Sequence, residues 1–310
     1  MSDTIIETAG LTKRYRDKMA VSDLDLQIAR GEVFGFLGPN GAGKTTTILM
    51  LLGLTEPSHG TASVCGFNPT TQPLEVKRRV GYLPENPGFY EDLTARENLA
   101  YIARLNRIGE DRMSGLLQQV LDQVGLADDA DRPVREFSRG MKQRLGIGEV
   151  LVKEPEVIIL DEPTLGIDPE GVTRLLDLIT RLQREQGLTV LLCSHLLHQV
   201  QQVCQRIGII VRSRMVVQGS PDELGKAIRQ EHQWNFLVEV GGDQPVEEAL
   251  SGLPGVDQCE RQDGGYLLRC TRDVRPELMT MVRDKRLDLL QLRAEDPTLE
   301  EIYLKYFREA

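Results

Sequence analysis

The hydrophobic and polar positions of this chain follow two different periods in successive blocks. In residues 5–37 short apolar runs alternate with turns, and Leu24, Leu26 and Ile28 stand at every second position, which is typical of a half-buried strand. From Thr94 to Val152 the apolar positions recur at a helical spacing instead, and no strand pattern appears. The strand pattern returns after this block. We therefore predict an α/β unit with an α-helical subdomain at about residues 94–152, inserted between two β-containing halves.

Turn and capping signals bound the individual elements. Thr94-Ala95-Arg96-Glu97 has the pattern of a capping box, and Asp168-Pro169 pairs an N-cap residue with proline at the first helical position. Strands are expected at 5–8, 20–28, 32–37, 61–64, 80–83, 157–160, 189–193, 207–211 and 215–218. Helices are expected at 45–52, 94–106, 110–124, 138–152 and 169–186, and a further helix is expected to begin at Ser220.

A second pattern begins near Trp234. It reads as strand, helix, two strands, helix and strand, an order that predicts a small α+β unit of the ferredoxin-like type. Thr298 and Glu301 stand where a capping box would begin one more helix, at 298–307. We therefore predict two domains, residues 1–230 and 231–310. Within the second, strands are expected at 236–240, 256–261, 266–270 and 287–292, with helices at 245–253 and 275–285.

Composition is that of a soluble globular protein. Of the 310 residues, 40% are hydrophobic and 27% are charged. Apolar runs such as 48–54 fall far short of the ~18–20 residues that span a bilayer, and no basic-then-apolar signal opens the chain. A role at a membrane would therefore require docking onto another protein that spans it.

Charge and cysteine content exclude further classes. The formal net charge of −10 and the pI near 5.1 argue against a nucleic-acid partner, which needs a basic surface. None of the cysteines forms a Cys-x-x-Cys pair, so the sequence indicates neither a disulfide framework nor a zinc site, and buried thiols in a reducing cytoplasm are expected. The five cysteines are Cys65, Cys193, Cys204, Cys259 and Cys270.

One glycine-rich stretch matches the phosphate-binding P-loop pattern, in which two glycines are followed by Lys and Ser or Thr. The predicted strand 32–37 precedes it and a predicted helix follows, which is the required context. Glycines allow successive backbone N–H groups to face a phosphate, and the helix N-terminus adds partial positive charge. We therefore predict a nucleotide site in which Lys44 holds the β- and γ-phosphates and the hydroxyl of Thr45 binds Mg²⁺. The stretch is Gly38-Pro39-Asn40-Gly41-Ala42-Gly43-Lys44-Thr45-Thr46.

Two adjacent carboxylates indicate the type of nucleotide chemistry. Asp161 and Glu162 follow the apolar strand 157–160, and the carboxyl ends of such strands are where open α/β sheets bind ligands. Asp161 fits a Mg²⁺ ligand, and Glu162 is a residue type that orients and deprotonates an attacking water. A kinase would need a pocket for a second substrate and no such glutamate. The pair therefore favours nucleotide hydrolysis.

Taken in order, these motifs resemble the ATP-binding subunit of an ABC transporter over the first ~230 residues. The resemblance implies that Tyr15 is the aromatic residue that stacks on adenine and that His195 is the switch histidine that reaches the γ-phosphate. It also places the signature motif at 137–141, with Ser138 and Gly140 contacting a phosphate. The matching segments are 38–45 (Walker A), 157–162 (Walker B), 165–168 (D-loop) and 137–141 (signature).

Two positions depart from the family pattern. Arg139 and Met141 replace a glycine and a glutamine of the signature Leu-Ser-Gly-Gly-Gln, and Glu85 replaces the usual glutamine of the Q-loop. A carboxylate at position 85 also suits Mg²⁺ or water, although its charge differs. Both variants, with the small C-terminal domain, resemble the ATPases of ABC-2 type exporters, the group of drug and sodium extrusion systems.

The resemblance implies a Mg²⁺-dependent ATPase that works as a homodimer on the inner, cytoplasmic face of the cell membrane. Its partner would be a multi-helix permease that docks near residues 85–92 and selects the transported substrate. Glu162 would act as base, while Lys44 and His195 would stabilise developing charge.

Other interpretations stay open at the level of sequence. A soluble ABC ATPase that assembles another complex fits the same motifs. Translation factors of the family carry two ATPase halves and basic linkers, and repair ATPases carry long coiled coils, and neither feature is found here. His195 and His198 are spaced like metal ligands on a helix, but no third ligand is close in sequence.

Overall fold

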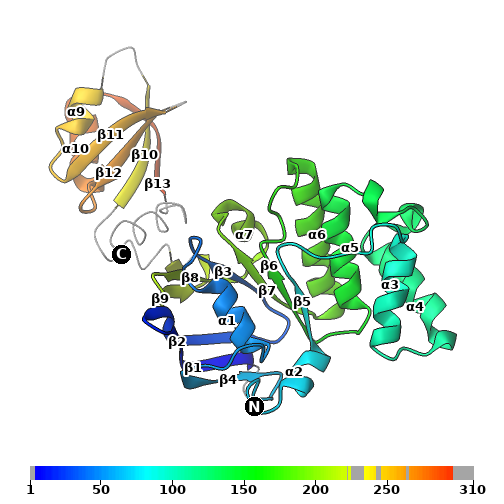
Figure 1. Cartoon of the computed structure of the whole chain (residues 1–310). Coiled ribbons are helices and arrows are strands. Elements are labelled where there is room, and N and C mark those ends of the chain that lie inside the picture. Colours follow the sequence, from blue (N-terminus) through cyan, green and yellow to red (C-terminus); the bar gives the residue numbers. More distant parts are fainter. Residues whose placement is uncertain (1–3, 222, 225–233, 242–245, 263–264, 296–310) are drawn as a thin grey trace. The chain divides into compact units, whose positions relative to one another are not determined.

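The computed structural model describes residues 4–221, 223–224, 234–241, 246–262 and 265–295, and the chain divides into two compact units, Met1–Gln218 and Gly219–Glu309 (Figure 1). The predicted domain boundary at 230/231 falls among residues outside these ranges and stays a prediction. The predicted helix at 298–307 also lies outside the described residues.

A six-stranded sheet forms the centre of the first unit. Its order is β5-β6-β7-β3-β8-β9, and the pairs from β5 to β8 are parallel. Every residue of β3, β6 and β7 is buried, as expected for strands covered on both faces, and this explains their continuous apolar sequences. The strands are β5 (Val80–Leu83), β6 (Val157–Asp161), β7 (Thr189–Ser194), β3 (Val33–Leu37), β8 (Arg206–Val211) and β9 (Arg214–Gly219).

A three-stranded antiparallel sheet, in the order β2-β1-β4, lies over one face of the six-stranded sheet, with helix α1 (Lys44–Leu51) between them (Figure 1). The strands are β1 (Thr4–Tyr15), β2 (Lys18–Ala29) and β4 (His59–Val64). The prediction that the first strand is confined to 5–8 was wrong. Register shifts interrupt the alternation after Thr8 and Leu11, and Gly10 has a φ of +57°, so the period of two breaks inside a continuous strand.

Helices cover the rest of the first unit. The capping box is confirmed, since Thr94 Oγ1 accepts from the N–H of Glu97 at 3.1 Å and Glu97 Oε2 accepts from the N–H of Thr94 at 2.8 Å. Two short helices, α2 and α7, were not predicted, and α2 buries only Val76, so it leaves almost no apolar period. The helices are α2 (Pro73–Arg79), α3 (Ala95–Leu105), α4 (Glu110–Gln123), α5 (Arg139–Leu151), α6 (Pro169–Gln186) and α7 (Leu197–Val203). Within the described ranges, none of the helices combines the length and the apolar character that crossing a membrane requires.

The second unit confirms the ferredoxin-like prediction. Its sheet has the order β11-β12-β10-β13 with antiparallel pairs, so the first strand of the unit lies between the third and the fourth. Phe236, Val238 and Leu268 form its apolar core with Leu250 and Leu278 of the two helices. The elements are β10 (Trp234–Gly241), α9 (Glu247–Ser251), β11 (Val256–Gln262), β12 (Gly265–Cys270), α10 (Arg275–Asp284) and β13 (Asp288–Glu295).

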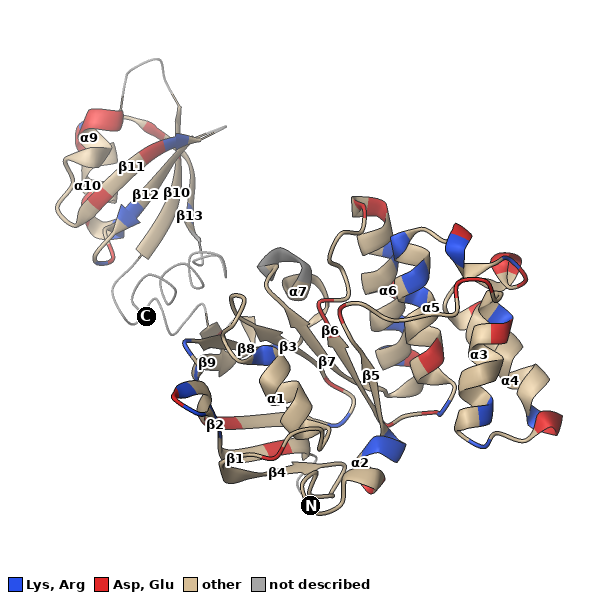
Figure 2. Cartoon of the chain, in the orientation of Figure 1, with Lys and Arg blue, Asp and Glu red and all other residues tan. Residues whose placement is uncertain are grey.

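Acidic and basic residues are interspersed along the helical block (Figure 2). Several of them form local ion pairs. Three exposed ion pairs are Arg96–Asp131, Arg104–Glu110 and Arg112–Glu154. Pairs of this kind contribute little stability, about 0–1 kcal/mol each. They balance charge on the surface of the block.

Glu149 on α5 makes stability depend on pH. Burial raises its pKa from 4.5 to about 8. Between these values the folded chain keeps a proton that the unfolded chain has lost, so stability falls as the pH rises through this window. At pH 8 we expect Glu149→Gln to melt at a higher temperature than the natural chain, because its free energy of unfolding is larger by about 1 kcal/mol or more. Near pH 4.5 the two melting temperatures should be similar.

Thermal unfolding between pH 4.5 and 8 measures this effect. Glu185→Gln is the matched control, because Glu185 is exposed on α6. A stability difference between Glu149→Gln and the natural chain that is the same at every pH would contradict the prediction.

Candidate active site

The glycine-rich loop joins β3 to α1, and close packing explains two of its glycines, Gly38 and Gly43. Gly43 is the N-cap of α1 with a φ of +116°, in the left-handed region that favours glycine. A Cβ atom on Gly43 would lie 2.4 Å from the carbonyl oxygen of Ala20, and one on Gly38 would lie 2.4 Å from that of Ile210. Any side chain at either position would push the loop away from the surrounding strands.

A cavity of about 330 Å³ opens above this loop. Tyr15 and Lys18 lie on one side of it, at the ends of the hairpin formed by β1 and β2, and sequence reasoning missed Lys18. The sequence feature that could have identified Lys18 is its position three residues after Tyr15, across a tight turn. The lining residues are Tyr15, Lys18, Ala20, Pro39, Asn40, Gly41, Gly43, Lys44, Thr45, Thr46, Glu85, Asp161 and Glu162.

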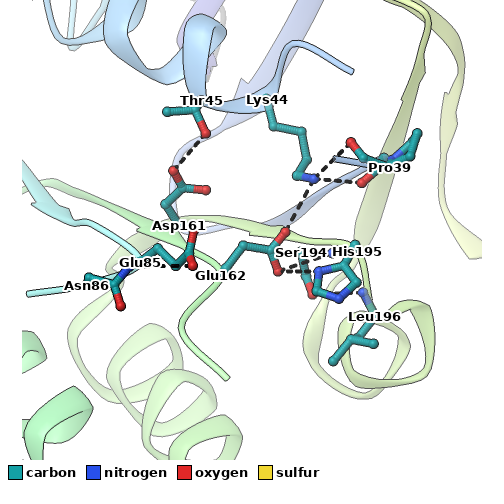
Figure 3. A network of polar contacts seen from close by, with 11 residues as sticks. Pro39, Lys44, Thr45, Glu85, Asn86, Asp161, Glu162, Ser194, His195 and Leu196 are labelled. Carbon is teal, nitrogen blue, oxygen red and sulfur yellow. Dashed lines mark hydrogen bonds and ion pairs between the residues drawn. The ribbon is translucent and has the colours of Figure 1, made fainter. Parts of the chain in front are cut away.

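Lys44, Glu162 and His195 form a connected network (Figure 3). The ammonium of Lys44 lies 3.3 Å from Glu162 Oε1 and donates to the carbonyl oxygens of Gly38 at 2.6 Å and Pro39 at 3.3 Å. The other carboxylate oxygen of Glu162, Oε2, lies 2.9 Å from His195 Nδ1 and accepts the backbone N–H of His195 at 3.3 Å. Glu162 is therefore held between a cation and an imidazole.

The backbone of Glu162 is unusual. Its φ is +50°, which is uncommon for a residue with a side chain, and its N–H donates to the carbonyl of Cys193 at 2.9 Å. Glu162 Oε1 is buried and accepts no hydrogen bond within the described residues, so its neighbour is the ammonium of Lys44. The loop geometry and this neighbour fix the direction of the carboxylate.

Thr45 and Asp161 meet beside this network. Thr45 Oγ1 donates to Asp161 Oδ2 at 3.1 Å. Burial raises the pKa of Asp161, the hydrogen bond from Thr45 lowers it, and the negative charge of Glu162 raises it further. A hydroxyl and a carboxylate next to each other are oxygen donors of the kind that Mg²⁺ accepts, with water and phosphate completing its shell. The residues present therefore fit a Mg²⁺ ion.

Glu85 lines the cavity from the loop that follows β5. Its backbone carbonyl accepts from Nε2 of Gln143 on α5 at 3.2 Å, while Gln143 is 2% exposed. This bond ties the loop to the helical block. Gln143 Oε1 is buried and has no hydrogen-bond partner in the described part of the chain.

Tyr15 is 46% exposed and lines the cavity. The ammonium of Lys13 lies 4.9 Å from its ring centroid. An exposed ring at the end of a hairpin is accessible to a flat ligand, and adenine stacking on Tyr15 stays a prediction.

Ser138 and Gly140 lie at the N-terminus of α5 and do not line this cavity. Ser138 is exposed and caps α5, its Oγ accepting from the N–H of Met141 at 3.3 Å. In the part of the chain that the structure describes, no three His, Cys, Asp or Glu side chains gather as a metal site, and the side chain of His198 is not described.

Comparisons with known proteins agree with this geometry. A family model described as ABC transporter matches residues 21–165. The bacitracin transport ATP-binding protein BcrA of Bacillus licheniformis is 36% identical over 97% of each chain. The Nod factor export ATP-binding protein I of Burkholderia pseudomallei (strain K96243) is 38% identical over 98% of this chain and 97% of its own length.

A solved structure is also similar to this chain. CbiO1 of Clostridium perfringens, described as part of the ABC transporter complex cbiONQ, superposes with a TM-score of 0.68 at 28% identity. The match covers 74% of this chain and 94% of that protein.

Proposed function

Because this chain belongs to the family of ABC transporter ATP-binding proteins, we propose that it is the ATP-hydrolysing motor subunit of an exporter. One observation carries the proposal. Glu162 contacts both Lys44 and His195 at the edge of a cavity that the P-loop lines, beside the Thr45–Asp161 pair. This arrangement suits the attack of a water on a terminal phosphate.

Each side chain then has a distinct task. Tyr15 stacks on adenine, and the loop residues Gly38, Asn40, Gly41, Gly43 and Thr46 surround the phosphates with Lys44. Mg²⁺, held by Thr45 and Asp161 with Glu85 close to the same space, would supply positive charge to the phosphate oxygens.

Glu162 accepts the proton of the attacking water. Lys44 leaves Glu162 for the phosphates when ATP binds, which frees the carboxylate to act as a base. His195 keeps Glu162 oriented through its Nδ1 and turns its other ring nitrogen toward the γ-phosphate. Removal of His195 should therefore misplace Glu162.

We propose that a separate multi-helix permease is the partner, which places this chain on the cytoplasmic face of the membrane. The relatives named for bacitracin transport and Nod factor export support this proposal and favour export. Residues 85–92 are the proposed docking segment. Within this segment, Tyr90 is 53% exposed. Its ring packs edge-on against that of Tyr101 of α3, with 4.9 Å between the two ring centroids.

A second copy of the chain would complete each site. Ser138 and Gly140 are exposed or partly exposed and lie outside the cavity of their own chain. Two copies related by a two-fold axis place the α5 N-terminus of each over the phosphates of the other. ATP binding would then close the dimer and move the permease.

Mixing two inactive variants tests this function. We expect Ser138→Arg and Lys44→Ala each to be nearly inactive alone, because each dimer then lacks a part of both sites. A mixture should regain part of the ATPase activity, since a mixed dimer contains one intact site. Steady-state phosphate release measures the recovery, after cross-linking has shown that mixed dimers form.

The control is Lys77→Ala mixed with Lys44→Ala, because Lys77 lies on α2 and outside the cavity. Full activity of Ser138→Arg alone would overturn the shared site. A natural chain that binds no ATP would overturn the proposed function itself.

A further inference from the structure

The N-terminus of α5 packs against the loop between β6 and α6. A Cβ atom placed on Gly166 would lie 3.0 Å from Nη1 and 3.1 Å from Cζ of Arg139, so the guanidinium lies directly against this glycine. Gly166 has a φ of +70°. Beside this contact, a Cβ atom on Gly140 would lie 3.3 Å from Cγ2 of Ile167. The loop and the start of α5 therefore approach closely at two places, through the side chain of Arg139 and the side chain of Ile167.

Arg139 meets the loop through van der Waals contact with Gly166. Its side chain is exposed, and it forms no hydrogen bond or ion pair with any residue that the structure describes. A flat guanidinium stacks well on a peptide surface that has no side chain to hold it off. The glycine that the family signature has at this position could not make the contact.

A short and stiff segment joins Gly166 to Glu162. The N–H of Leu165 donates to the carbonyl of Glu162 at 3.2 Å, and the N–H of Ile167 donates to the carbonyl of Thr164 at 3.3 Å. Beyond it, Asp168 Oδ1 accepts from the N–H of Gly171 at 2.8 Å and fixes the loop to α6. A displacement of Gly166 would therefore also move the backbone of Glu162.

We propose that Arg139 is a positioning residue that couples the two ATP sites of the dimer. This inference rests on the proposed function, in which Ser138 contacts the ATP of the partner copy. When that contact fixes the start of α5, Arg139 fixes Gly166, and the loop holds Glu162 of its own chain in place. Each copy then hydrolyses its ATP fastest when the partner's site is also filled.

ATPase rates measured against ATP concentration test the coupling. For Arg139→Gly we expect kcat to fall by about fivefold or more and the Hill coefficient to fall from about 2 toward 1, with the concentration at half-maximal rate little changed. Arg139→Lys keeps the charge without the flat group and should lose coupling as well. Arg174→Gln is the control for loss of an exposed arginine, and its kinetics should match the natural chain.

Unchanged kcat and Hill coefficient in Arg139→Gly would overturn the inference, and so would complete rescue by Arg139→Lys. If the natural chain itself hydrolyses no ATP, the proposed function is wrong. If the natural chain hydrolyses ATP and the Arg139 variants behave like it, only the role of Arg139 is wrong. Melting temperatures show that each variant folds.

A second measurement separates positioning from direct binding of phosphate. In chains that also carry Glu162→Gln, we expect ATP to drive dimer formation equally well with Arg139 or with Arg139→Gly, as measured by light scattering. A clear loss of dimer in the double variant would show that Arg139 binds the nucleotide itself and would contradict the positioning role.

Discussion

Glu162→Gln is expected to bind ATP as tightly as the natural chain and to hydrolyse it about a hundredfold more slowly or worse, because general base catalysis contributes about 10²–10⁴ in rate. The amide keeps the size of the side chain and a hydrogen bond to His195, but it cannot accept the proton of the water. Binding is preserved because Glu162 acts mainly in the transition state. Fluorescent-nucleotide titration and phosphate release measure the two effects separately.

The control is Glu110→Gln, an exposed carboxylate on α4. Turnover by Glu162→Gln at the natural rate would remove Glu162 from the role of base. Loss of ATP binding in the same variant would instead indicate that the Lys44–Glu162 contact shapes the empty loop.

Lys44→Ala is expected to weaken ATP binding by about a hundredfold, since a buried charge pair that loses one partner costs about 2–5 kcal/mol. The side chain of Lys44 is 6% exposed, and its ammonium contacts both the loop carbonyls and Glu162. Its loss removes the positive charge that faces the phosphates in the ground state. Calorimetric titration with ATP measures the change.

Lys44 also bridges the carbonyls of Gly38 and Pro39, so its loss could unfold the loop. A melting temperature near that of the natural chain would show that the Lys44→Ala variant is folded. The matched control Lys77→Ala should bind ATP normally. Tight binding by folded Lys44→Ala would contradict the proposed phosphate contact.

Much of the fold was predictable because its signals are local. Continuous apolar strands predicted the buried sheet, and Asp168 was identified as an N-cap from its place before Pro169, as its hydrogen bond to Gly171 confirms. The strand order of the second unit followed from an alternation of elements that permits few topologies. The extension of β1 past Gly10 was missed because bulges cancel the period on which the prediction depends.

Several residues that line the cavity have sequence signals of their own, whereas the contacts between them do not. The P-loop and the Asp161–Glu162 pair have sequence signals of their own. That Lys44 lies 3.3 Å from Glu162, and Glu162 2.9 Å from His195, depends on three parallel strands that lie side by side. No local pattern contains that information. The contact between Arg139 and Gly166 was hidden for the same reason.

The hydrogen bond from Gln143 to the carbonyl of Glu85 has a mechanical consequence. It makes one wall of the cavity a part of the helical block, whereas the P-loop floor is a part of the sheet. Rotation of the block relative to the sheet therefore changes the width of the nucleotide pocket, and a nucleotide that prefers one width biases the rotation. We therefore expect that a partner protein bound to the block would change the affinity for ATP, and that ATP would change the affinity for that partner by the same factor.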